Sequence, residues 1–399
     1  MSAPGAIQSL AFVCPRYAAG GTVGGAETLL RELARRAARA GRRVAFLTTC
    51  AKSHFTWANE IEPGARRDGD LEVRYFPVDA DRDAERFLRI QGEIDRRAGV
   101  SRADEEAWIA NSVNSRALCD HLRERGGDYD RIVLGPYLFG VTWRAAQIHP
   151  SKSFLVPCLH DEPFAYLSIM TDLFRAVHGC LFNSEPERDL AARLYGTGGA
   201  RGLVVGMGLD PFEADPSAYA ARRGLAAPYV AYAGRRESAK GTPLLVDYLD
   251  AFRARTGRDI RLVVTGSGPI DARPFVIDEG FVSEADKHAI MAGARAFVHP
   301  SVMESFGIVL LESFLAGTPG LVHAGGAVLR WQCERSGAGL WFRHYPDFEE
   351  LLVRLLDDDA LRASLGARGR DYVRREYAWD AVERRFFQAL EEESPKDEG

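Results

Sequence analysis

The stretch His299-Pro-Ser-Val-Met-Glu304-Ser-Phe-Gly-Ile-Val-Leu-Leu-Glu312 is the most informative segment of the chain. An apolar run, Ala294–Val298, leads into it and ends at Pro300. A short polar loop containing Gly307 follows, and then a second run whose apolar residues recur with the period of a helix. This order of features predicts a strand, a tight turn and a helix.

The two glutamates of this stretch are eight residues apart. Glu304 falls in the turn before the predicted helix, and Glu312 falls about two turns further along. At roughly 1.5 Å per residue, the two carboxylates are separated by up to about 12 Å. This is too far for an acid–base pair acting on one bond, but it suits two ends of an elongated ligand. The first amide groups of the helix, at Phe306, Gly307 and Ile308, add an anion site.

The first half of the chain alternates between predicted strands and helices. A βαβ unit is predicted from the strand Gln8–Val13, the loop Gly20–Gly25, the helix Glu27–Ala40 and the strand Arg43–Thr48. Further strands are predicted at Leu71–Pro77, Arg131–Leu134, Ser153–Leu159, Gly179–Phe182 and Leu203–Val205. Ser184 is placed to cap a helix over Pro186–Leu194. The less regular residues 51–128 read as an insertion, with helices between Asp79 and Arg125.

A second alternating series follows the linker-like segment Pro211–Pro216. Its predicted strands are Tyr229–Ala233, Arg261–Thr265, Pro274–Ile277 and Ala296–His299, and its helices include Thr242–Thr256 and Ser283–Ala294. Two such series predict an α/β fold with two Rossmann-like domains facing a central cleft. The helices Leu361–Tyr377 and Trp379–Leu390 end the chain, followed by an acidic tail.

Composition narrows the class of protein. A chain of 399 residues with 46% hydrophobic and 27% charged residues fits a soluble protein of two or three domains, and its net charge of -5 disfavours non-specific nucleic-acid binding. The six cysteines are scattered without metal-ligand spacing, which predicts reduced thiols and argues against a disulfide framework or a zinc site. No signal peptide is evident, and no apolar run reaches the roughly 18 residues of a membrane span. We therefore expect a cytoplasmic protein, with peripheral contact to the inner face of the membrane left open.

A second motif, Tyr232-Ala-Gly-Arg235-Arg-Glu-Ser-Ala-Lys240-Gly241, follows a predicted strand and opens a helix. Loops in this position line the ligand-binding edge of an α/β sheet. Arg235 and Lys240, five residues apart, can hold a diphosphate from two sides, because arginine offers a planar fork and lysine a mobile point charge. A surface basic loop is the alternative interpretation.

Two further motifs lie in the first half. Gly24 and Gly25 precede a helix, where glycines allow phosphates to approach the backbone closely, although the dinucleotide fingerprint is missing. His160, at a predicted strand end, can donate to a sugar hydroxyl or a phosphate oxygen. It can also be a hydrogen-bonded structural histidine, or a metal ligand with Asp161 and Glu162. We expect no metal, because no partner ligands are suitably spaced.

Other charged segments have simpler interpretations. Asp79-Ala-Asp81 and Asp357-Asp358-Asp359 resemble D-x-D metal sites, but nothing nearby could hold a diphosphate, so we interpret them as solvated surface carboxylates. The first helix is basic, and its face is either solvated or rests on anionic lipid. Its arginines, with the two that follow it, are Arg31, Arg35, Arg36, Arg39, Arg42 and Arg43.

The string Pro-Ser-x-x-Glu-Ser-Phe-Gly-x-x-x-Leu-Glu-x-x-x-Ala-Gly-Thr-Pro, residues 300–319, resembles the E-x7-E signature of retaining GT-B glycosyltransferases of the family 4 type. The segments at Gly24–Glu27, His160 and Arg235–Gly241 resemble motifs of the same family. This resemblance implies an N-terminal acceptor domain at residues 1–207, a donor domain at 208–377, and a helix at 378–395 that crosses back to the N-terminal domain.

The resemblance also implies roles for individual residues. His160 and Glu304 would contact the donor sugar, Arg235 and Lys240 the diphosphate, and Glu312 the ribose of the nucleotide. The remaining residues expected to bind the donor are Gly24, Gly25, Gly266, Phe281, Val282, Ser305, Phe306, Gly307 and Ile308. The co-substrate would be a UDP- or GDP-sugar, with no other cofactor and no metal ion.

Some segments depart from the family pattern. Before the linker the chain reads Val205-Gly-Met-Gly-Leu-Asp210, where the family resembles Val-Pro-Asn-Gly-Val-Asp. After Gly325-Gly326, the glutamate that the family places within a few residues is delayed to Glu334. These differences affect the expected shape of the donor-sugar and acceptor pockets.

The sequence favours a hexosyltransferase that acts on a polysaccharide, glycolipid, small molecule or other glycoconjugate, in a bacterium. One alternative is a catalytically silent regulator of the same fold that binds a sugar nucleotide. Another is a nicotinamide-dependent dehydrogenase, which the absent fingerprint disfavours.

Overall fold

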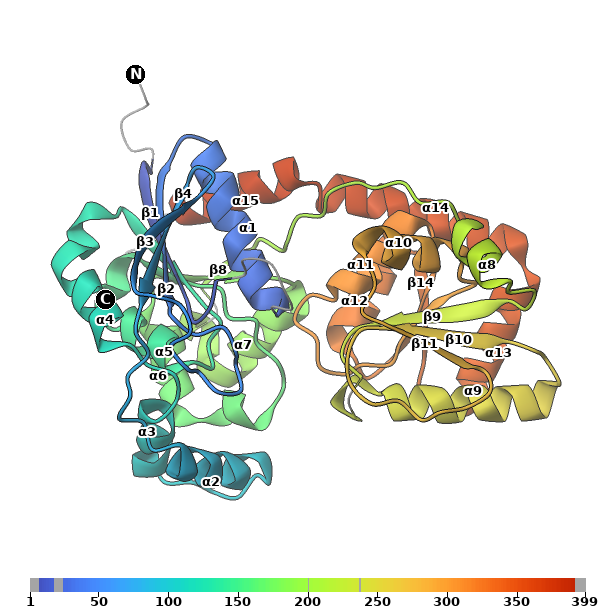
Figure 1. Cartoon of the computed structure of the whole chain (residues 1–399), viewed down its shortest axis with the longest axis horizontal. Helices are drawn as coiled ribbons and strands as arrows, with labels where there is room; N and C mark the ends of the chain where they lie inside the picture. The colour runs from blue at the N-terminus through green and yellow to red at the C-terminus, as the bar shows by residue number, and fades with distance from the viewer. Residues whose placement is uncertain (1–6, 18–23, 200, 237, 392–399) are drawn as a thin grey trace. The chain divides into compact units, whose positions relative to one another are not determined.

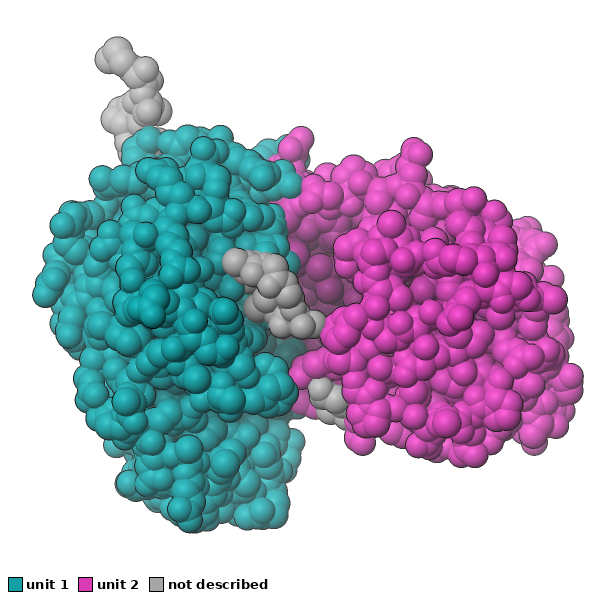
Figure 2. All heavy atoms as spheres, viewed as in Figure 1, with its two compact units in different colours: residues 1–206, 383–399 teal, residues 207–382 magenta. Residues whose placement is uncertain are grey.

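The computed structural model describes residues 7–17, 24–199, 201–236 and 238–391 (Figure 1). The predicted loop Gly20–Gly25 and the acidic tail therefore lie partly outside the described residues. The chain forms two compact units, coloured separately in Figure 2. Unit 1 consists of residues 1–206 and 383–399, and unit 2 of residues 207–382. The domain boundaries expected from the family resemblance lie after residue 207 and before residue 378.

Unit 1 contains, in the described part of the chain, a sheet of eight strands in the order β3-β4-β2-β1-β5-β6-β7-β8. Its neighbouring strands are parallel except for the antiparallel hairpin of β3 and β4. The strands are β1 Ser9–Cys14, β2 Arg43–Thr49, β3 Gly64–Asp68, β4 Leu71–Phe76, β5 Arg131–Leu134, β6 Ser153–Leu155, β7 Gly179–Phe182 and β8 Gly202–Val204.

The helices of unit 1 cover both faces of this sheet, with α1 and α4 on opposite sides (Figure 1). The α-helices are α1 Gly25–Arg39, α2 Ala84–Asp95, α3 Arg102–Ala110, α4 Arg116–Arg125, α5 Gly140–Ala146, α6 Ser168–Ala176 and α7 Glu185–Gly199. Ser184 caps α7 as predicted, because its hydroxyl accepts a hydrogen bond from the Glu187 amide at 3.3 Å.

Among its described residues, unit 2 contains a sheet of six strands in the order β11-β10-β9-β12-β13-β14, and its neighbouring strands are parallel. The strands are β9 Tyr229–Ala233, β10 Arg261–Thr265, β11 Val276–Gly280, β12 Phe297–His299, β13 Gly320–His323 and β14 Gly339–Phe342. The helices α9 and α10 lie on opposite sides of this sheet (Figure 1). Its α-helices are α8 Ala218–Arg223, α9 Thr242–Thr256, α10 Glu284–Gly293, α11 Ile308–Ala316, α12 Ala327–Ser336, α13 Tyr345–Asp357 and α14 Asp359–Glu376.

The final helix, α15 Trp379–Glu391, begins in unit 2 and ends in unit 1. Its Phe386 ring stacks on Phe12 of β1 at 6.2 Å, and Arg131 of β5 donates to the Leu390 carbonyl at 2.9 Å. The last helical residues are therefore part of unit 1, although they are far from it in sequence.

Three strand assignments differ between the sequence prediction and the structure. No strand is predicted over Gly64–Asp68, within the less regular residues 51–128, but this segment pairs with β4 as an edge strand. The strand predicted at Ser153–Leu159 ends at Leu155, before Pro157 and before Cys158, whose φ is +51°. The strand expected from Pro274 begins instead at Val276, since proline supplies no amide to a ladder.

Candidate active site

Three glycines bring the ends of β9 and β10 together in unit 2. Gly234 and Gly266 have φ values of +136° and +108°. A Cβ atom on Gly266 would lie 2.1 Å from the Gly234 carbonyl oxygen, and one on Gly268 would lie 2.6 Å from the Arg236 carbonyl oxygen. Glycine is required at both positions because no side chain fits. This close approach holds the loop with Arg235 at the carboxyl edge of the sheet, where parallel α/β sheets bind ligands.

The two adjacent arginines of this loop differ in exposure. Arg236 is buried, its Nη2 atom donates to the Gly266 carbonyl at 2.9 Å, and its Nη1 atom lies 2.5 Å from Asp278 of β11. Arg235 is exposed. The buried guanidinium therefore supports the strand ends, and the exposed one is the cation that a ligand can reach.

Lys240 contacts the first glutamate of the E-x7-E pair. Its Nζ atom donates to Glu304 Oε1 at 2.7 Å and to the Met303 carbonyl at 3.1 Å. His299, at the end of β12, is buried, and its Nε2 atom lies 3.4 Å from the same carboxylate oxygen. Two residues that are 64 positions apart are thus joined at the sheet edge.

The surroundings of Glu304 keep its carboxylate ionised. Burial alone would raise the pKa of this group. The hydrogen bond and charge from His299 and the charge of Lys240 outweigh burial and hold the pKa of Glu304 well below its usual range. A carboxylate with this pKa accepts hydrogen bonds from hydroxyl groups and does not act as a general acid near neutral pH.

Glu312 lies on α11 in a separate ion pair. The Nζ atom of Lys287 on α10 lies 3.0 Å from both carboxylate oxygens of Glu312 and 2.8 Å from Glu284. Burial raises the pKa of Glu312 and Lys287 lowers it, with a net upward shift. The two glutamates of the motif are therefore tuned in opposite directions.

The start of α11 depends on Gly307, which precedes the helix with φ +81°. A Cβ atom there would lie 2.5 Å from the Leu329 side chain. The Phe306 ring is buried and packs edge-on against Tyr377 at 5.2 Å, so this residue can face a ligand only through its backbone. Ser305 and Ile308 are half-buried.

Phe281 and Val282, expected to bind the donor, directly follow β11. The Phe281 side chain is 65% exposed and Val282 is half-buried. An exposed aromatic ring beside the strand ends is available for stacking.

In unit 1, Gly24 and Gly25 lie where α1 begins. A Cβ atom on Gly24 would be 2.6 Å from the Glu27 carboxylate, whereas Gly25 has open space around its Cα. Glu27 is buried and accepts from Arg16 Nε at 3.2 Å and Nη2 at 2.6 Å. This ion pair holds the Glu27 carboxylate close to Gly24 at the start of α1.

His160 follows β6, also in unit 1, and is partly exposed, with its Nδ1 atom 3.8 Å from Glu162 Oε1. The same Glu162 oxygen accepts a hydrogen bond from the Tyr137 hydroxyl at 2.7 Å. Asp161 is engaged elsewhere, with Arg193 at 2.8 Å. The carboxylates beside His160 thus have protein partners of their own.

Sequence reasoning missed His299, Lys287 and Arg236. His299 could have been noticed as a histidine at the end of an apolar strand, directly before Pro300. Lys287 carries no comparable signal, because its role depends on the contact between α10 and α11. Arg236 is adjacent to the predicted Arg235, and only its burial distinguishes the two.

Among the described residues, Glu284, His288 and Glu312 form a group whose ligand atoms lie within 4.8 Å of one another. The ammonium group of Lys287 already contacts two of these carboxylates, at 2.8 Å and 3.0 Å. Two nearby cationic charges repel each other, so this group fits a metal ion poorly.

The D-x-D-like segments are paired with arginines at the surface. Arg116 contacts both Asp81 oxygens, at 2.9 Å and 3.0 Å, and Arg258 contacts Asp357 at 2.6 Å. Asp81 and Asp357 have side chains that are 66% and 54% exposed, as expected for surface carboxylates.

Several arginines of the basic segment around α1 contact other groups of unit 1. Arg36 lies 3.6 Å from Glu383, the Arg42 guanidinium lies 4.0 Å from the centre of the Phe387 ring, and Arg43 donates to a backbone carbonyl at 2.6 Å. These contacts use part of the face that could otherwise meet lipid. Across the described ranges, no helix is both long and apolar enough to span a bilayer.

The two units share the architecture of solved GT-B proteins. An E. coli structure described as trehalose-6-phosphate bound with UDP-2-fluoro glucose aligns with a TM-score of 0.71 and 14% identity, covering 97% of this chain and 100% of that one. The Anabaena protein HepE, in complex with UDP and glucose, aligns with a TM-score of 0.68 and 16% identity, covering 96% and 99%. The protein has a GT-B fold.

The sequence is similar to several glycosyltransferases. Residues 222–372 match the family described as glycosyl transferases group 1. A D-inositol 3-phosphate glycosyltransferase of Xylanimonas cellulosilytica is 27% identical over 406 residues, covering 90% of this chain and 89% of that protein. A GDP-mannose-dependent phosphatidylinositol dimannoside mannosyltransferase of Mycobacterium tuberculosis is 35% identical over 117 residues, covering 27% of this chain and 30% of that protein. Together these matches support a glycosyltransferase of the GT-B, family 4 type.

Proposed function

We propose that the protein is a retaining hexosyltransferase that moves a sugar from a nucleoside-diphosphate sugar to an acceptor hydroxyl without a metal ion. The observation that carries this proposal is the ion pair of Lys240 and Glu304 at 2.7 Å, at the carboxyl edge of the unit 2 sheet. It puts a cation for the diphosphate beside a carboxylate for the sugar. Retention is implied by the family resemblance.

The donor would bind on unit 2, residues 207–382, with its nucleotide toward α10 and α11. Glu312 would accept hydrogen bonds from the ribose hydroxyls, with Lys287 balancing its charge. Phe281, Val282 and the loop at Gly266 would contact the base and ribose. Relatives named as GDP-mannose-dependent and fold neighbours bound to UDP support GDP or UDP as the nucleotide.

The diphosphate would lie against Arg235, Lys240 and the first amides of α11. As the bond from the sugar to the diphosphate breaks, negative charge grows on the leaving oxygen. Cations and amide groups fixed at that position stabilise the transition state more than the ground state, and this difference accelerates transfer. Glu304 and His160 would orient the sugar ring by accepting from, or donating to, its hydroxyl groups.

The acceptor would bind on unit 1, which carries Gly24, Gly25 and His160. The acceptors in the relatives' names are an inositol phosphate and phosphatidylinositol mannosides. An acceptor with several hydroxyl groups, either a polyol phosphate or a glycolipid, therefore fits the proposal.

Metal independence rests on the charges present in the chain. Arg235 and Lys240 supply the positive charge that a divalent cation supplies in D-x-D enzymes, and the Glu284, His288 and Glu312 group is occupied by Lys287. Transfer should therefore continue in the presence of EDTA. If EDTA abolished transfer and added Mg²⁺ or Mn²⁺ restored it, this part of the proposal would be contradicted.

Direct detection of the reaction tests the proposal. A thermal-shift screen of UDP- and GDP-sugars identifies the donor, because a ligand that binds the folded state raises the unfolding temperature. Single-turnover release of nucleoside diphosphate is then measured after an acceptor is added. Donor binding without release, across acceptors of the classes above, would favour a sugar-nucleotide-binding regulator. The anomeric configuration of the product, determined by NMR, tests retention.

A further inference from the structure

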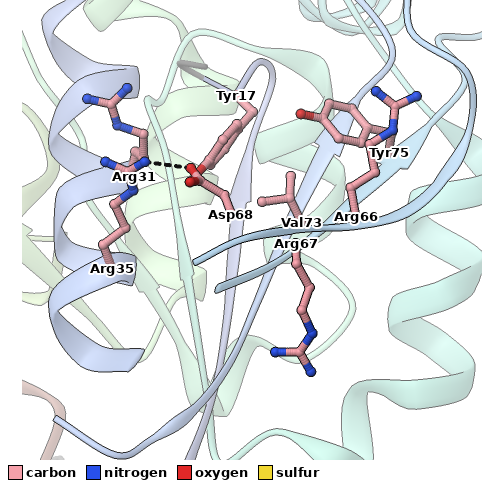
Figure 3. A pocket seen from close by; sticks show the side chains of 8 residues that line it. All are labelled: Tyr17, Arg31, Arg35, Arg66, Arg67, Asp68, Val73 and Tyr75. Carbon is pink, nitrogen blue, oxygen red and sulfur yellow. Dashed lines mark hydrogen bonds and ion pairs between the residues drawn. The ribbon is translucent and has the colours of Figure 1, made fainter. Parts of the chain in front are cut away.

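A pocket in unit 1, separate from the residues assigned above, lies between α1 and the β3–β4 hairpin. Its volume is about 440 Å³, within the range of small-ligand sites. Four arginines, two tyrosines, one aspartate and one valine line it (Figure 3). They are Tyr17, Arg31, Arg35, Arg66, Arg67, Asp68, Val73 and Tyr75.

One side of the pocket is a fixed charged network. Asp68 accepts a hydrogen bond from the Tyr17 hydroxyl, and Arg35 donates to the same carboxylate at 2.6 Å. These partners outweigh burial and lower the pKa of Asp68. Arg31 lies beside this network in Figure 3 and is 3.0 Å from Glu32. This side therefore offers arginine N–H donors together with an ionised carboxylate that can accept from hydroxyl groups.

The opposite side holds Arg66 and Tyr75 from the hairpin. The Arg66 guanidinium lies 5.1 Å from the centre of the Tyr75 ring and donates to the Glu62 carbonyl at 3.2 Å. Among the residues that the structure describes, no carboxylate lies within ion-pair distance of Arg66. The guanidinium is exposed and keeps N–H groups available for a ligand.

The hairpin register separates Arg66 from its neighbour Arg67. Arg66 pairs with the buried Val73, whereas Arg67 pairs with Glu72. Because side chains alternate along a strand, these two arginines project from opposite faces. Figure 3 shows the Arg67 side chain pointing away from the group formed by Tyr17 and Asp68. Arg74 on β4 is the matched control for Arg66, because it lies between the lining residues Val73 and Tyr75 in sequence, is not one of the lining residues itself, and contacts Glu72 at 3.0 Å.

We propose that this pocket binds the phosphate group of a phosphorylated ligand that also carries hydroxyl groups. The planar guanidinium groups of Arg66 and of the α1 arginines can each donate two parallel hydrogen bonds to two oxygens of one phosphate group. Asp68 and the two tyrosine hydroxyls would bind hydroxyl groups of the same molecule. A sugar phosphate and a phospholipid headgroup share this chemistry. Binding here requires no transfer reaction, so the inference can hold or fail independently of the proposed function.

Calorimetric titration of the full chain tests the proposal, with inorganic phosphate and glucose 6-phosphate as probes. Arg66→Gln should weaken the binding of both probes by about tenfold, because one charge-assisted contact is lost. Arg74→Gln should leave both affinities within about twofold, since Arg74 alternates with Val73 and Tyr75 along β4 and projects from the other face of the hairpin. Tyr75→Phe, which keeps the ring, should weaken glucose 6-phosphate and spare inorganic phosphate.

Vesicles distinguish the two sources of the phosphate group. Cosedimentation is measured with phosphatidylcholine vesicles that contain phosphatidylglycerol and with vesicles of phosphatidylcholine alone. If the protein binds the vesicles that contain phosphatidylglycerol and Arg66→Gln weakens this binding, the pocket holds a lipid headgroup. If the protein binds glucose 6-phosphate but not these vesicles, the pocket holds a soluble ligand. The proposal is overturned if neither the phosphate probes nor the vesicles bind. It is also overturned if Arg66→Gln has the same unfolding temperature as the natural chain and binds the probes equally well.

Discussion

The Nζ atom of Lys287 lies 3.0 Å from each carboxylate oxygen of Glu312 and therefore neutralises the glutamate that the motif assigns to the nucleotide ribose. Lys287 comes from α10 and Glu312 from α11, so the pair also ties the two helices together. Burial raises the pKa of Glu312, and the charge of Lys287 and its hydrogen bond oppose this shift, so Lys287 favours the ionised carboxylate.

Replacement of Lys287 by methionine should weaken nucleotide binding in a pH-dependent way. Without the cation the pKa of Glu312 rises further, so a larger fraction is protonated at a given pH. At about pH 6 the affinity for nucleoside diphosphate should fall by about tenfold, the equivalent of one charge-assisted hydrogen bond, and it should recover as the pH rises. Calorimetric titration at several pH values measures this effect.

Lys287→Arg and Glu284→Gln are the controls for that experiment. Arginine keeps the cation, and Glu284 is an exposed partner of Lys287 rather than a ribose ligand. Both variants should bind nucleotide at pH 6 nearly as the natural chain does. A Lys287→Met variant with unchanged affinity across this pH range would remove Lys287 from the donor site.

Lys240→Ala should lower the turnover number by about two to three orders of magnitude, because one fixed cation at the leaving group is lost. It should also lower the unfolding temperature, since Glu304 would keep a buried charge with one partner fewer. The double variant Lys240→Met/Glu304→Gln should recover stability without recovering turnover. If the double variant recovered both, the role of Lys240 would be structural alone.

The low pKa of Glu304 predicts how stability depends on pH. A carboxyl group whose pKa is lower in the folded state than in the unfolded chain stabilises the fold above the unfolded value, about 4.3 for glutamate. This contribution is lost as the pH falls below that value. The difference in unfolding free energy between the natural chain and Glu304→Gln should therefore be largest near neutral pH and should shrink in acid. Urea unfolding over this range checks the prediction, and the exposed Glu284 provides the control substitution Glu284→Gln.

The crowded glycine at the end of β10 gives a test of backbone geometry. Gly266→Ala should destabilise the protein by more than about 3 kcal/mol, because the new Cβ would overlap the Gly234 carbonyl oxygen. Gly257→Ala is the matched control in the same unit. Gly257 also has a positive φ, +68°, but no atom lies within 4 Å of the added carbon, so about 1 kcal/mol is expected. Equal effects in urea unfolding would contradict the role of this close approach.

Elements with a strong local signal could be predicted from the sequence. The strands Tyr229–Ala233 and Arg261–Thr265 and the helix Thr242–Thr256 have the predicted bounds, because apolar runs there are flanked by glycine or by charged residues. The strands β13 and β14 were not predicted.

Elements that form through tertiary contacts could not be predicted. The strand β3 has the sequence Gly-Ala-Arg-Arg-Asp, which lacks strand-forming residues, and it exists because β4 offers an edge to pair with. Within the candidate site, residue types and loop positions were predictable, but partners were not. The contacts of Glu304 with His299 and of Glu312 with Lys287 depend on which strand ends and helices become neighbours.

The last helix has a consequence for how this protein is made. Residues 383–391 complete unit 1: Phe386 stacks on the first strand, and Arg385 donates to the Val205 carbonyl at 3.0 Å. A ribosome synthesises these residues after all the described strands of both sheets. The core of unit 1 therefore cannot be completed until α15 has been synthesised, whereas residues 207–382 can fold earlier. A stop codon a few residues before Glu383 would damage the half of the protein that was synthesised first.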